Sequence, residues 1–303
     1  MICTRRALLV GSASAVLRSI KVSGSDRLTG AAETATDRLR AIESTLGGRL
    51  GVAAIDTGSG RRLAYRDRER FPMCSTFKVL LAAQVLARVD AGQEHLNRVI
   101  PYGATDLLDY APVTRAHVGD GGMTVEGLTA AAVEQSDNTA ANLLLATLGG
   151  PAGFTQYLRS IGDSVTRLDR IEPTLNSAEP GDDRDTTTPA AMLKDLQVVL
   201  LDTALTRPSR DRLVSWLLES STGATKLRAG LPTGWRVGDK TGTGAHGSNN
   251  DVALAWFASG APVVIAAYSV GSTATQAARD AALAEVARVV TSTVGTAGAI
   301  FFF

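Results

Sequence analysis

Cysteine is scarce in this chain of 303 residues, which contains only Cys3 and Cys74. Two cysteines cannot supply the framework of a disulfide-rich secreted scaffold. If an N-terminal segment that includes Cys3 is removed, Cys74 is left alone and no internal disulfide can form. The fold must then be stabilised by its core, and a hydrophobic share of 45% is enough for a substantial one.

Histidine is equally scarce, and its three positions lie far apart in the sequence. His95, His117 and His246 show none of the spacing that zinc hydrolases use. None of them lies in a sequence context typical of a Ser-His-Asp hydrolase. We therefore expect three surface histidines, no metal site and no cofactor.

An excess of charge of either sign is also missing. Lys and Arg number 31 against 30 Asp and Glu, which gives a formal net charge of +1. Such a balance creates no overall field that would attract nucleic acid or an anionic membrane. We expect a small molecule as the partner, no nucleic acid, and a monomeric protein.

Long apolar runs are absent too, and the run near the N-terminus, Ala7–Leu17, is too short to span a bilayer as a helix. The paired Arg5 and Arg6 precede it, and together they resemble a twin-arginine export signal. We predict that residues 1–32 form a signal that is removed and that residues 33–303 form the mature domain. The protein would then be exported to the periplasm, the cell envelope or the medium.

Patterns typical of strands occur near the two ends of the chain. Toward the N-terminus, two apolar runs separated by Gly58-Ser59-Gly60 predict a hairpin. After Trp235, three further runs are separated by turns rich in glycine and serine. The expected strands are residues 50–56, 61–65, 236–240, 251–257 and 263–269.

The middle of the chain is predicted to be helical. After Ser75 the residues are apolar on nearly every face as far as Leu86, which predicts a helix that is buried on all sides. Gly149-Gly150 ends another helical stretch. The further expected helices are residues 125–135, 139–148, 189–202 and 209–219, with a last one at 275–290.

These elements predict an α/β fold of the α+β sandwich type. A five-stranded antiparallel sheet is built from both chain ends with flanking helices, and an all-α part is inserted between them. The α/β part covers residues 33–74 and 216–303, and the all-α part covers residues 75–215. The active site is expected between the two parts.

Four short motifs follow one another along the chain. A bare SxxK motif is expected by chance about once in a chain of this length, whereas the ordered set of four should almost never occur. The set resembles the class A serine β-lactamases, whose pattern contains SxxK, SDN, a glutamate motif and KTG. The four motifs are Ser75-Thr76-Phe77-Lys78, Ser136-Asp137-Asn138, Glu172-Pro173-Thr174-Leu175-Asn176 and Lys240-Thr241-Gly242.

The first motif also suits a nucleophile on chemical grounds. Ser75 is expected in the first turn of the buried helix, where free backbone N–H groups and the helix dipole favour negative charge. Lys78 follows one turn later on the same face, within reach of the Ser75 hydroxyl. An isolated SxxK more often combines an N-cap serine with a snorkelling lysine. A lysine in an otherwise apolar run, however, needs partners and usually has a task.

The resemblance implies a catalytic role for several of these residues. Ser75 would carry the acyl group, and Ser136 would pass a proton to the departing lactam nitrogen. Glu172 would act as general base on a water molecule that Asn176 also holds. Whether Lys78 or Glu172 deprotonates Ser75 is an open question for the family.

The resemblance also implies a substrate-binding cleft. The backbone amides of Ser75 and Thr243 would form the oxyanion hole. Asn138 would bind the substrate side chain and Lys78. The other implied substrate-binding residues are Lys240, Thr241, Gly242, Thr243 and Lys226, with Tyr110 as one wall of the cleft.

The stretch of residues 167–188 has neither helical nor strand periodicity, and it is long for a connection inside a compact domain. Arg170 and Asp185 stand near its ends and resemble the ion pair that closes the family's Ω-loop, which here covers residues 167–185. The bond between Glu172 and Pro173 can be cis, because X–Pro bonds adopt that form readily.

Two positions depart from the family pattern. Many members carry an arginine for the substrate carboxylate, and the corresponding positions here are Asn249 and Lys226. A lysine is a point charge without the bidentate fork of arginine. Some carbapenemases tie the cysteine beside the nucleophile to a second one after KTG, but that second position is Gly244. Cys74 is therefore expected to be a small buried hydrophobe.

The implied function is hydrolysis of the β-lactam amide of penicillins and cephalosporins through a Ser75 acyl-enzyme, which confers resistance. A penicillin-binding DD-peptidase is an alternative that shares SxxK, SxN and KTG but lacks the ExxLN water site. A penicilloyl-binding sensor without turnover is another, and it would normally be tethered by a membrane span, which the sequence does not show. The aromatic end, Ile300–Phe303, has no place in this scheme.

Overall fold

The computed structural model describes residue 1, residues 24–257 and residues 260–294, with the backbone alone for residues 24–33. The Arg5-Arg6 pair, the Ala7–Leu17 run and the aromatic end therefore lie outside the described residues. Among the helices of the described part, none is both long and apolar enough to cross a bilayer.

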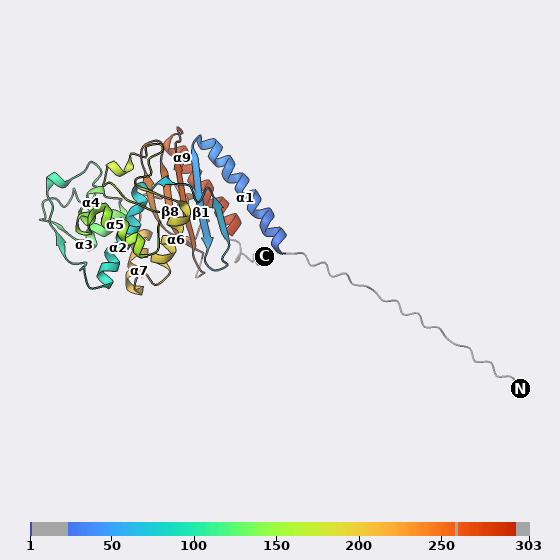
Figure 1. The fold of residues 1–303 in the computed structure, drawn as a ribbon, viewed down its shortest axis with the longest axis horizontal. Coiled ribbons are helices and arrows are strands. Elements are labelled where there is room, and N and C mark those ends of the chain that lie inside the picture. Colours follow the sequence, from blue (N-terminus) through green and yellow to red (C-terminus); the bar gives the residue numbers. More distant parts are fainter. Residues whose placement is uncertain (2–23, 258–259, 295–303) are drawn as a thin grey trace.

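A five-stranded antiparallel sheet occupies the centre of the molecule (Figure 1). Its strand order is β2-β1-β9-β8-β7, so the N-terminal hairpin pairs with the C-terminal meander through β1 and β9. This confirms the predicted sheet, and the predicted bounds differ from the observed ones by three residues at most. The strands are β1 Arg49–Asp56, β2 Arg62–Tyr65, β7 Arg236–Thr243, β8 Asn249–Trp256 and β9 Val263–Val270.

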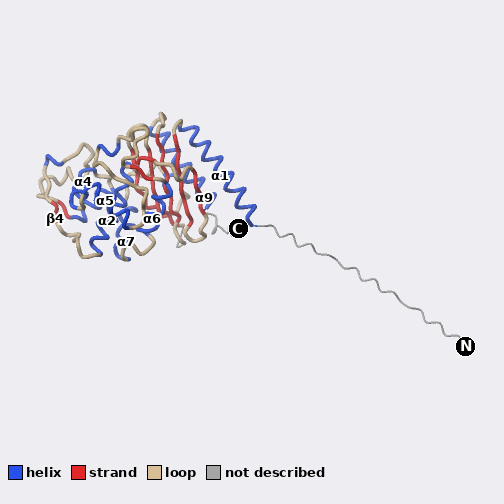
Figure 2. Tube along the Cα trace, in the orientation of Figure 1, coloured by secondary structure: helices blue, strands red, loops and turns tan. Residues whose placement is uncertain are grey.

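Both faces of the sheet are covered by helices (Figure 2). On β9, Val264 and Tyr268 belong to one core while Val263 and Ile265 belong to another, because alternate residues of a strand point to opposite faces. The terminal helices α1 (Gly24–Leu46) and α9 (Gln276–Val294) cover the second face. The inserted helices cover the first.

The inserted helices surround α2, which is buried from Phe77 to Leu86. This confirms the prediction of a helix that is wrapped on all sides. Its neighbours are α3 Val125–Glu134, α4 Asn138–Thr147, α5 Gly150–Ser160, α6 Pro189–Leu200 and α7 Arg207–Leu218, and α2 itself spans Phe77–Asp90.

Three α-helices of the described residues are missing from the sequence prediction. The helix α5 begins at Gly150 directly after α4, since Gly149 adopts a φ of 85° that ends one helix and Pro151 suits the first turn of the next. The helix α1 carries Ala35, Leu39 and Leu46 on its buried side. The short helix α8 (Leu227–Gly230) packs against α9.

Two small antiparallel strand pairs lie outside the main sheet. The strand β3 (Phe71–Pro72) pairs with β6 (Thr186–Thr187), which connects the segment before Ser75 to the end of the Ω-loop. The strand β4 (Val99–Ile100) pairs with β5 (Met123–Thr124) at the far end of the helical part.

Candidate active site

Ser75 lies in a 3₁₀ turn, Cys74–Thr76, that leads directly into α2. This turn packs against β7, and the approach is close. A Cβ atom at Gly242 would lie 2.8 Å from the carbonyl oxygen of Met73, so only glycine fits there without displacement. The KTG glycine thus allows the strand to come against the nucleophile turn.

Lys78 points into the centre of the site and is fully buried. Its Nζ lies 3.0 Å from Oε1 of Glu172 and donates to Oδ1 of Asn138 at 2.6 Å. It also donates to the backbone oxygen of Ser136 at 2.8 Å. Burial lowers the pKa of Lys78, and the neighbouring Glu172 carboxylate opposes that shift.

The SDN motif lies at the junction between α3 and α4. Asp137 caps α4 by accepting from the N–H of Ala140, and it also accepts from the N–H groups of Val113 and Thr114. Asp137 therefore fixes the loop, while Ser136 and Asn138 face the site.

Lys240 of β7 is the second fully buried lysine of the site. Its Nζ donates to Oγ of Ser136 at 3.0 Å and to the backbone oxygen of Thr241 at 3.1 Å. Burial lowers the pKa of Lys240 well below its usual value, and the charge of Lys78 acts in the same direction. The Ser136 hydroxyl thus lies between two lysines, since Nζ of Lys78 is 3.5 Å away from it.

The Ω-loop is closed by the pair that the sequence indicated. Nε of Arg170 donates to the Asp185 carboxylate at 2.5 Å, and the buried Asp185 also accepts from the N–H groups of Asp169 and Arg170. The peptide bond between Glu172 and Pro173 is cis.

The Ω-loop places Glu172 in the site, where this residue is only 2% exposed. Its Oε1 accepts from the Ser75 hydroxyl at 3.3 Å, and its Oε2 accepts from Nδ2 of Asn176 at 2.5 Å. The side-chain amide of Asn142, on α4, pairs with both the N–H and the carbonyl of Glu172. Asn142 belongs to no motif, and sequence reasoning missed it.

Residues with left-handed backbones stand beside these groups. Cys74 has a φ of 46°, Ser136 of 57° and Asp185 of 59°. Such conformations are unfavourable for residues other than glycine and tend to occur at functional sites. Cys74 directly precedes Ser75, Ser136 belongs to the SDN motif, and Asp185 is the partner of Arg170.

Ser75, Ser136 and Asn138 open onto a cleft of about 510 Å³. Tyr110, which is 51% exposed, forms part of its wall. Thr222 and Gln276 also line it, although no sequence motif marks them. The other lining residues are Ser75, Ser136, Asn138, Asn176, Lys226, Thr241, Gly242 and Thr243.

The two positions that replace the family arginine have different surroundings. Lys226 lines the cleft, and its Nζ donates to Oγ1 of Thr243 at 3.3 Å. Burial lowers the pKa of Lys226, and the nearby Asp251 opposes that shift. Asn249 is not among the lining residues, because its amide is bonded to Asp280 and Gln276 behind the cleft wall.

Cys74 is buried and free. Burial raises the pKa of its thiol to about 12, with Glu172 adding to the shift, so the thiolate is not populated at neutral pH. A Cβ atom at Gly244 would lie 2.7 Å from its sulfur, so the glycine leaves Cys74 without a thiol partner at that position.

The three histidines are exposed, as expected. Across the part of the chain that the structure describes, no group of three or more His, Cys, Asp or Glu side chains is arranged to hold a metal ion.

Comparisons with known proteins agree with this geometry. Residues 34–294 match the model of a family described as the β-lactamase enzyme family. The chain is 49% identical over 277 residues to β-lactamase AST-1 of Nocardia asteroides, covering 91% of this chain and 89% of the relative. It is 48% identical over 268 residues to β-lactamase L2 of Stenotrophomonas maltophilia, covering 88% of each. A solved ancestral class A β-lactamase is 61% identical, with a TM-score of 0.83 over 85% of this chain and 98% of that one.

Proposed function

The chain belongs to the β-lactamase enzyme family as a class A member that hydrolyses β-lactams. From that premise we propose which residues carry out each step of the reaction. The substrates would be penicillins and cephalosporins. Their amide bond would be broken in two steps through an ester on Ser75.

In the first step, Ser75 attacks the lactam carbonyl and must lose its proton. Its hydroxyl already donates to Oε1 of Glu172, and Lys78 lies against the same oxygen. This contact favours Glu172 as the acceptor of the proton, with the Nζ of Lys78 only 3.0 Å from the same oxygen. The backbone N–H groups of Ser75 and Thr243 would stabilise the oxyanion, and such donors typically lower the barrier by about 3 kcal/mol each.

The lactam nitrogen needs a proton when it leaves. Ser136 is suited to supply it, because its hydroxyl lies within hydrogen-bond distance of both Lys78 and Lys240. The two amines can replace the proton that the hydroxyl gives away.

The substrate itself would be held by groups along the cleft. Asn138 would bind the substrate side chain, while Lys240, Thr241 and Thr243 would bind its carboxylate, with Lys226 as an additional cation at that end.

In the second step, Glu172 would activate a water molecule that attacks the ester. Asn176 donates to one Glu172 oxygen, and its own Oδ1 is buried without a hydrogen-bond partner among the described residues. That oxygen can accept from the attacking water while Glu172 takes its proton. The contact of Glu172 with both Ser75 and Asn176 is the observation that carries the proposal.

Replacement of Glu172 by alanine tests the proposal. Loss of a general base typically slows a step roughly 10²- to 10⁴-fold. Glu172→Ala should therefore accumulate a Ser75-linked penicilloyl adduct, visible by intact mass spectrometry after mixing with benzylpenicillin, whereas the wild type should show little adduct.

A matched control is Glu179→Ala, which removes an exposed acid from the same loop and should turn over normally. If the wild type itself stays acylated for hours, the DD-peptidase or sensor alternative applies. If Glu172→Ala turns over like the wild type, the assignment of the loop is wrong.

We further propose that the protein acts outside the cytoplasm as a monomer, with residues 1–32 as a twin-arginine export signal and residues 33–303 as the mature enzyme. The paired Arg5 and Arg6 support this. A nitrocefin assay on purified residues 33–303, with the mass measured by light scattering, tests the mature domain and the monomer together.

A further inference from the structure

Asn250 lies on β8 directly opposite Gly242 of the KTG motif, and it is fully buried. Its Nδ2 donates to the backbone oxygens of Pro72 at 2.8 Å and Met73 at 3.1 Å. Its Oδ1 accepts from the backbone N–H of Ser269 on β9 at 3.3 Å. This single amide therefore connects the middle of the sheet to the segment that leads into the nucleophile turn.

The backbone of the nucleophile turn, Cys74–Thr76, must be held in place by its surroundings. Cys74 has a φ of 46°, and a left-handed conformation of this kind persists in a residue other than glycine only where other contacts fix it. The two carbonyls that Asn250 binds belong to the two residues directly before Cys74. Loss of both bonds should therefore let the turn relax and move relative to the sheet.

The two N–H groups proposed for the oxyanion hole belong to different elements, since Ser75 lies in the turn and Thr243 lies on β7. The strand β7 is at the edge of the sheet, and the N–H of Gly244 donates to the carbonyl of Ser248 across the hairpin. Successive N–H groups of a strand point to opposite sides, so the N–H of Thr243 points away from β8. Whether both N–H groups can reach one oxygen atom depends on how the turn sits against β7.

Two other contacts between the turn and the sheet act differently. Gly242 allows the close approach, because a Cβ atom there would lie 2.8 Å from the carbonyl oxygen of Met73, but it does not bind the turn. The hydroxyl of Tyr268 on β9 lies 3.1 Å from Oγ1 of Thr76, so it contacts a side chain and not the backbone. Asn250 is paired with β7 through its backbone and holds the backbone before the turn through its side chain.

We propose that Asn250 is a positioning residue of the oxyanion hole. It holds the nucleophile turn where the N–H groups of Ser75 and Thr243 can bind the same oxygen atom. Asn250 is fully buried and does not line the cleft, so it acts through the turn and not on the substrate. The inference rests on the proposed function, because an oxyanion forms only if Ser75 attacks the lactam carbonyl.

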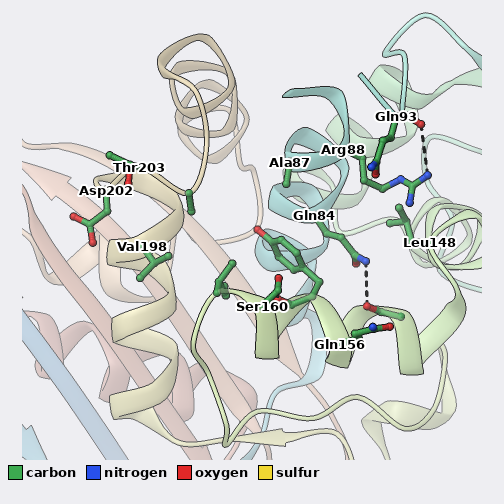
Figure 3. A pocket seen from close by; sticks show the side chains of 14 residues that line it. Gln84, Ala87, Arg88, Gln93, Leu148, Gln156, Ser160, Val198, Asp202 and Thr203 are labelled. Atoms are coloured by element: carbon green, nitrogen blue, oxygen red, sulfur yellow. Dashed lines mark hydrogen bonds between the residues drawn. The ribbon is translucent and has the colours of Figure 1, made fainter. Parts of the chain in front are cut away.

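A second buried amide provides a matched control. Gln84 lies on α2, the helix that follows the turn, and is 6% exposed. Its Nε2 donates to the backbone oxygen of Gly153 at 3.2 Å, as Figure 3 shows. This bond has the same chemistry as the bonds of Asn250, but it lies about two helical turns beyond the start of α2. Removal of either amide should lower the melting temperature, whereas only the loss of Asn250 should change the oxyanion hole.

Infrared difference spectroscopy of the acyl-enzyme tests the proposal. In the Glu172→Ala background, benzylpenicillin labelled with carbon-13 at the lactam carbonyl should give an ester band whose frequency reports the hydrogen bonds to that carbonyl. Addition of Asn250→Ala should move this band to a higher wavenumber, because the ester oxygen loses a well-placed donor. Addition of Gln84→Ala should leave the band at its original frequency.

The same replacements in the otherwise wild-type enzyme should differ in their kinetics. Asn250→Ala should lower kcat/KM for benzylpenicillin roughly 10²-fold, as is typical when a reacting group is misplaced. Gln84→Ala should stay within about twofold of the wild type. Asn250→Ser keeps a donor for one of the two carbonyls, so its band and its kcat/KM should lie between those of the wild type and Asn250→Ala. It decides the question if Asn250→Ala does not fold.

An ester band that stays at the frequency of Glu172→Ala in the Asn250 variants would overturn the inference, and so would an equal shift with Gln84→Ala. Absence of any penicilloyl adduct in the Glu172→Ala enzyme would instead contradict the proposed function, and the inference with it.

Discussion

The Ser75 hydroxyl donates to Oε1 of Glu172, and the same carboxylate oxygen lies 3.0 Å from the Nζ of the buried Lys78. Lys78 is itself satisfied by three acceptors, from Glu172, Asn138 and Ser136. A buried ammonium group is tolerated when it is paired in this way. The residues of the site therefore depend on one another, and the effects of single replacements should not be additive.

Replacement of Ser75 by alanine should abolish turnover, since the acyl group would have no oxygen on which to form. We expect kcat to fall by roughly 10⁴- to 10⁶-fold, as in other serine hydrolases that lose their nucleophile. Intact mass spectrometry should show no adduct with benzylpenicillin. Nitrocefin hydrolysis by the wild type should also be unchanged by EDTA, and a loss that zinc restores would overturn the serine assignment.

The ion pair between Arg170 and Asp185 closes the Ω-loop. Asp185 is buried, and Arg170 is its charged partner. Arg170→Ser would leave that carboxylate with backbone donors alone and loosen the loop. We expect activity on benzylpenicillin to fall and the ratio of kcat/KM for ceftazidime over benzylpenicillin to rise about tenfold, or about 1.4 kcal/mol.

The matched control for this loop is Arg184→Ser. Arg184 pairs with Asp182 at the surface, where its side chain is 54% exposed, so its loss should leave the substrate ratio unchanged. A ratio in Arg170→Ser equal to that of the control would show that the closure does not limit the size of the cleft.

A buried pair of carboxyls joins α6 to the segment after α5. Burial raises the pKa of Asp195 to about 9, and the charge of Asp163 adds to the shift. Asp195 is 1% exposed, and Asp163 accepts from the backbone N–H groups of Val165 and Thr166. At neutral pH Asp195 is therefore a protonated acid beside an ionised one. Lys194 and Arg159 oppose the shift but do not cancel it.

This pair predicts how stability changes with pH. Between the unfolded pKa near 4 and the folded pKa of about 9, the folded state holds a proton that the unfolded state has lost. The contribution of Asp195 to stability is thus complete below pH 4 and declines as pH rises, by at most about 1.4 kcal/mol per unit.

Asp195→Asn keeps a donor toward Asp163 and removes this titration. Its free energy of unfolding in urea should exceed that of the wild type at neutral pH, with a gap that widens toward pH 9. Asp211→Asn, at an exposed position of α7, should show no such trend. A gap that stays constant from pH 5 to pH 9 would contradict the shared proton.

Sequence patterns were sufficient for the sheet and for most helices, because each of these elements carries its own periodicity or turn signal. They were insufficient for α1, although Ala35, Leu39, Ile42 and Leu46 recur at helical spacing. A segment next to an expected export signal does not show from its own sequence that it packs against β1, β2 and the C-terminal helix α9.

The residues of the candidate site also fall into two groups, those that the sequence could place and those that it could not. Ser75, Lys78, Glu172 and Lys240 could be placed from motifs, because the chemistry requires those residue types at fixed spacing. Asn142, Thr222, Gln276 and the pair of Asp163 and Asp195 could not. Their contacts arise only when separate elements meet, and no local pattern marks them.

At the scale of the whole molecule, one sheet separates two cores. The core that contains α2 and α6 includes Met73 and Phe77, which flank the turn of Ser75, and the core that contains α1 and α9 lies on the opposite face of the sheet. Catalysis should therefore depend on packing in the first core, while stability depends on both, because the strands contribute side chains to each in alternation.

Leu39→Ala tests this separation. Leu39 is fully buried between α1 and the sheet, so its truncation should lower the free energy of unfolding by about 2–5 kcal/mol. The kcat for nitrocefin, measured well below the melting temperature, should stay within about twofold of the wild type, since Leu39 belongs to the core of α1 and α9, whereas Met73 and Phe77 beside Ser75 belong to the other core. Leu81→Ala, in α2 beside the buried Lys78, is the matched control and should lower both quantities. If Leu39→Ala reduced kcat as much as Leu81→Ala while the protein remained folded, the sheet would transmit packing changes between its faces, and the two cores would act as one.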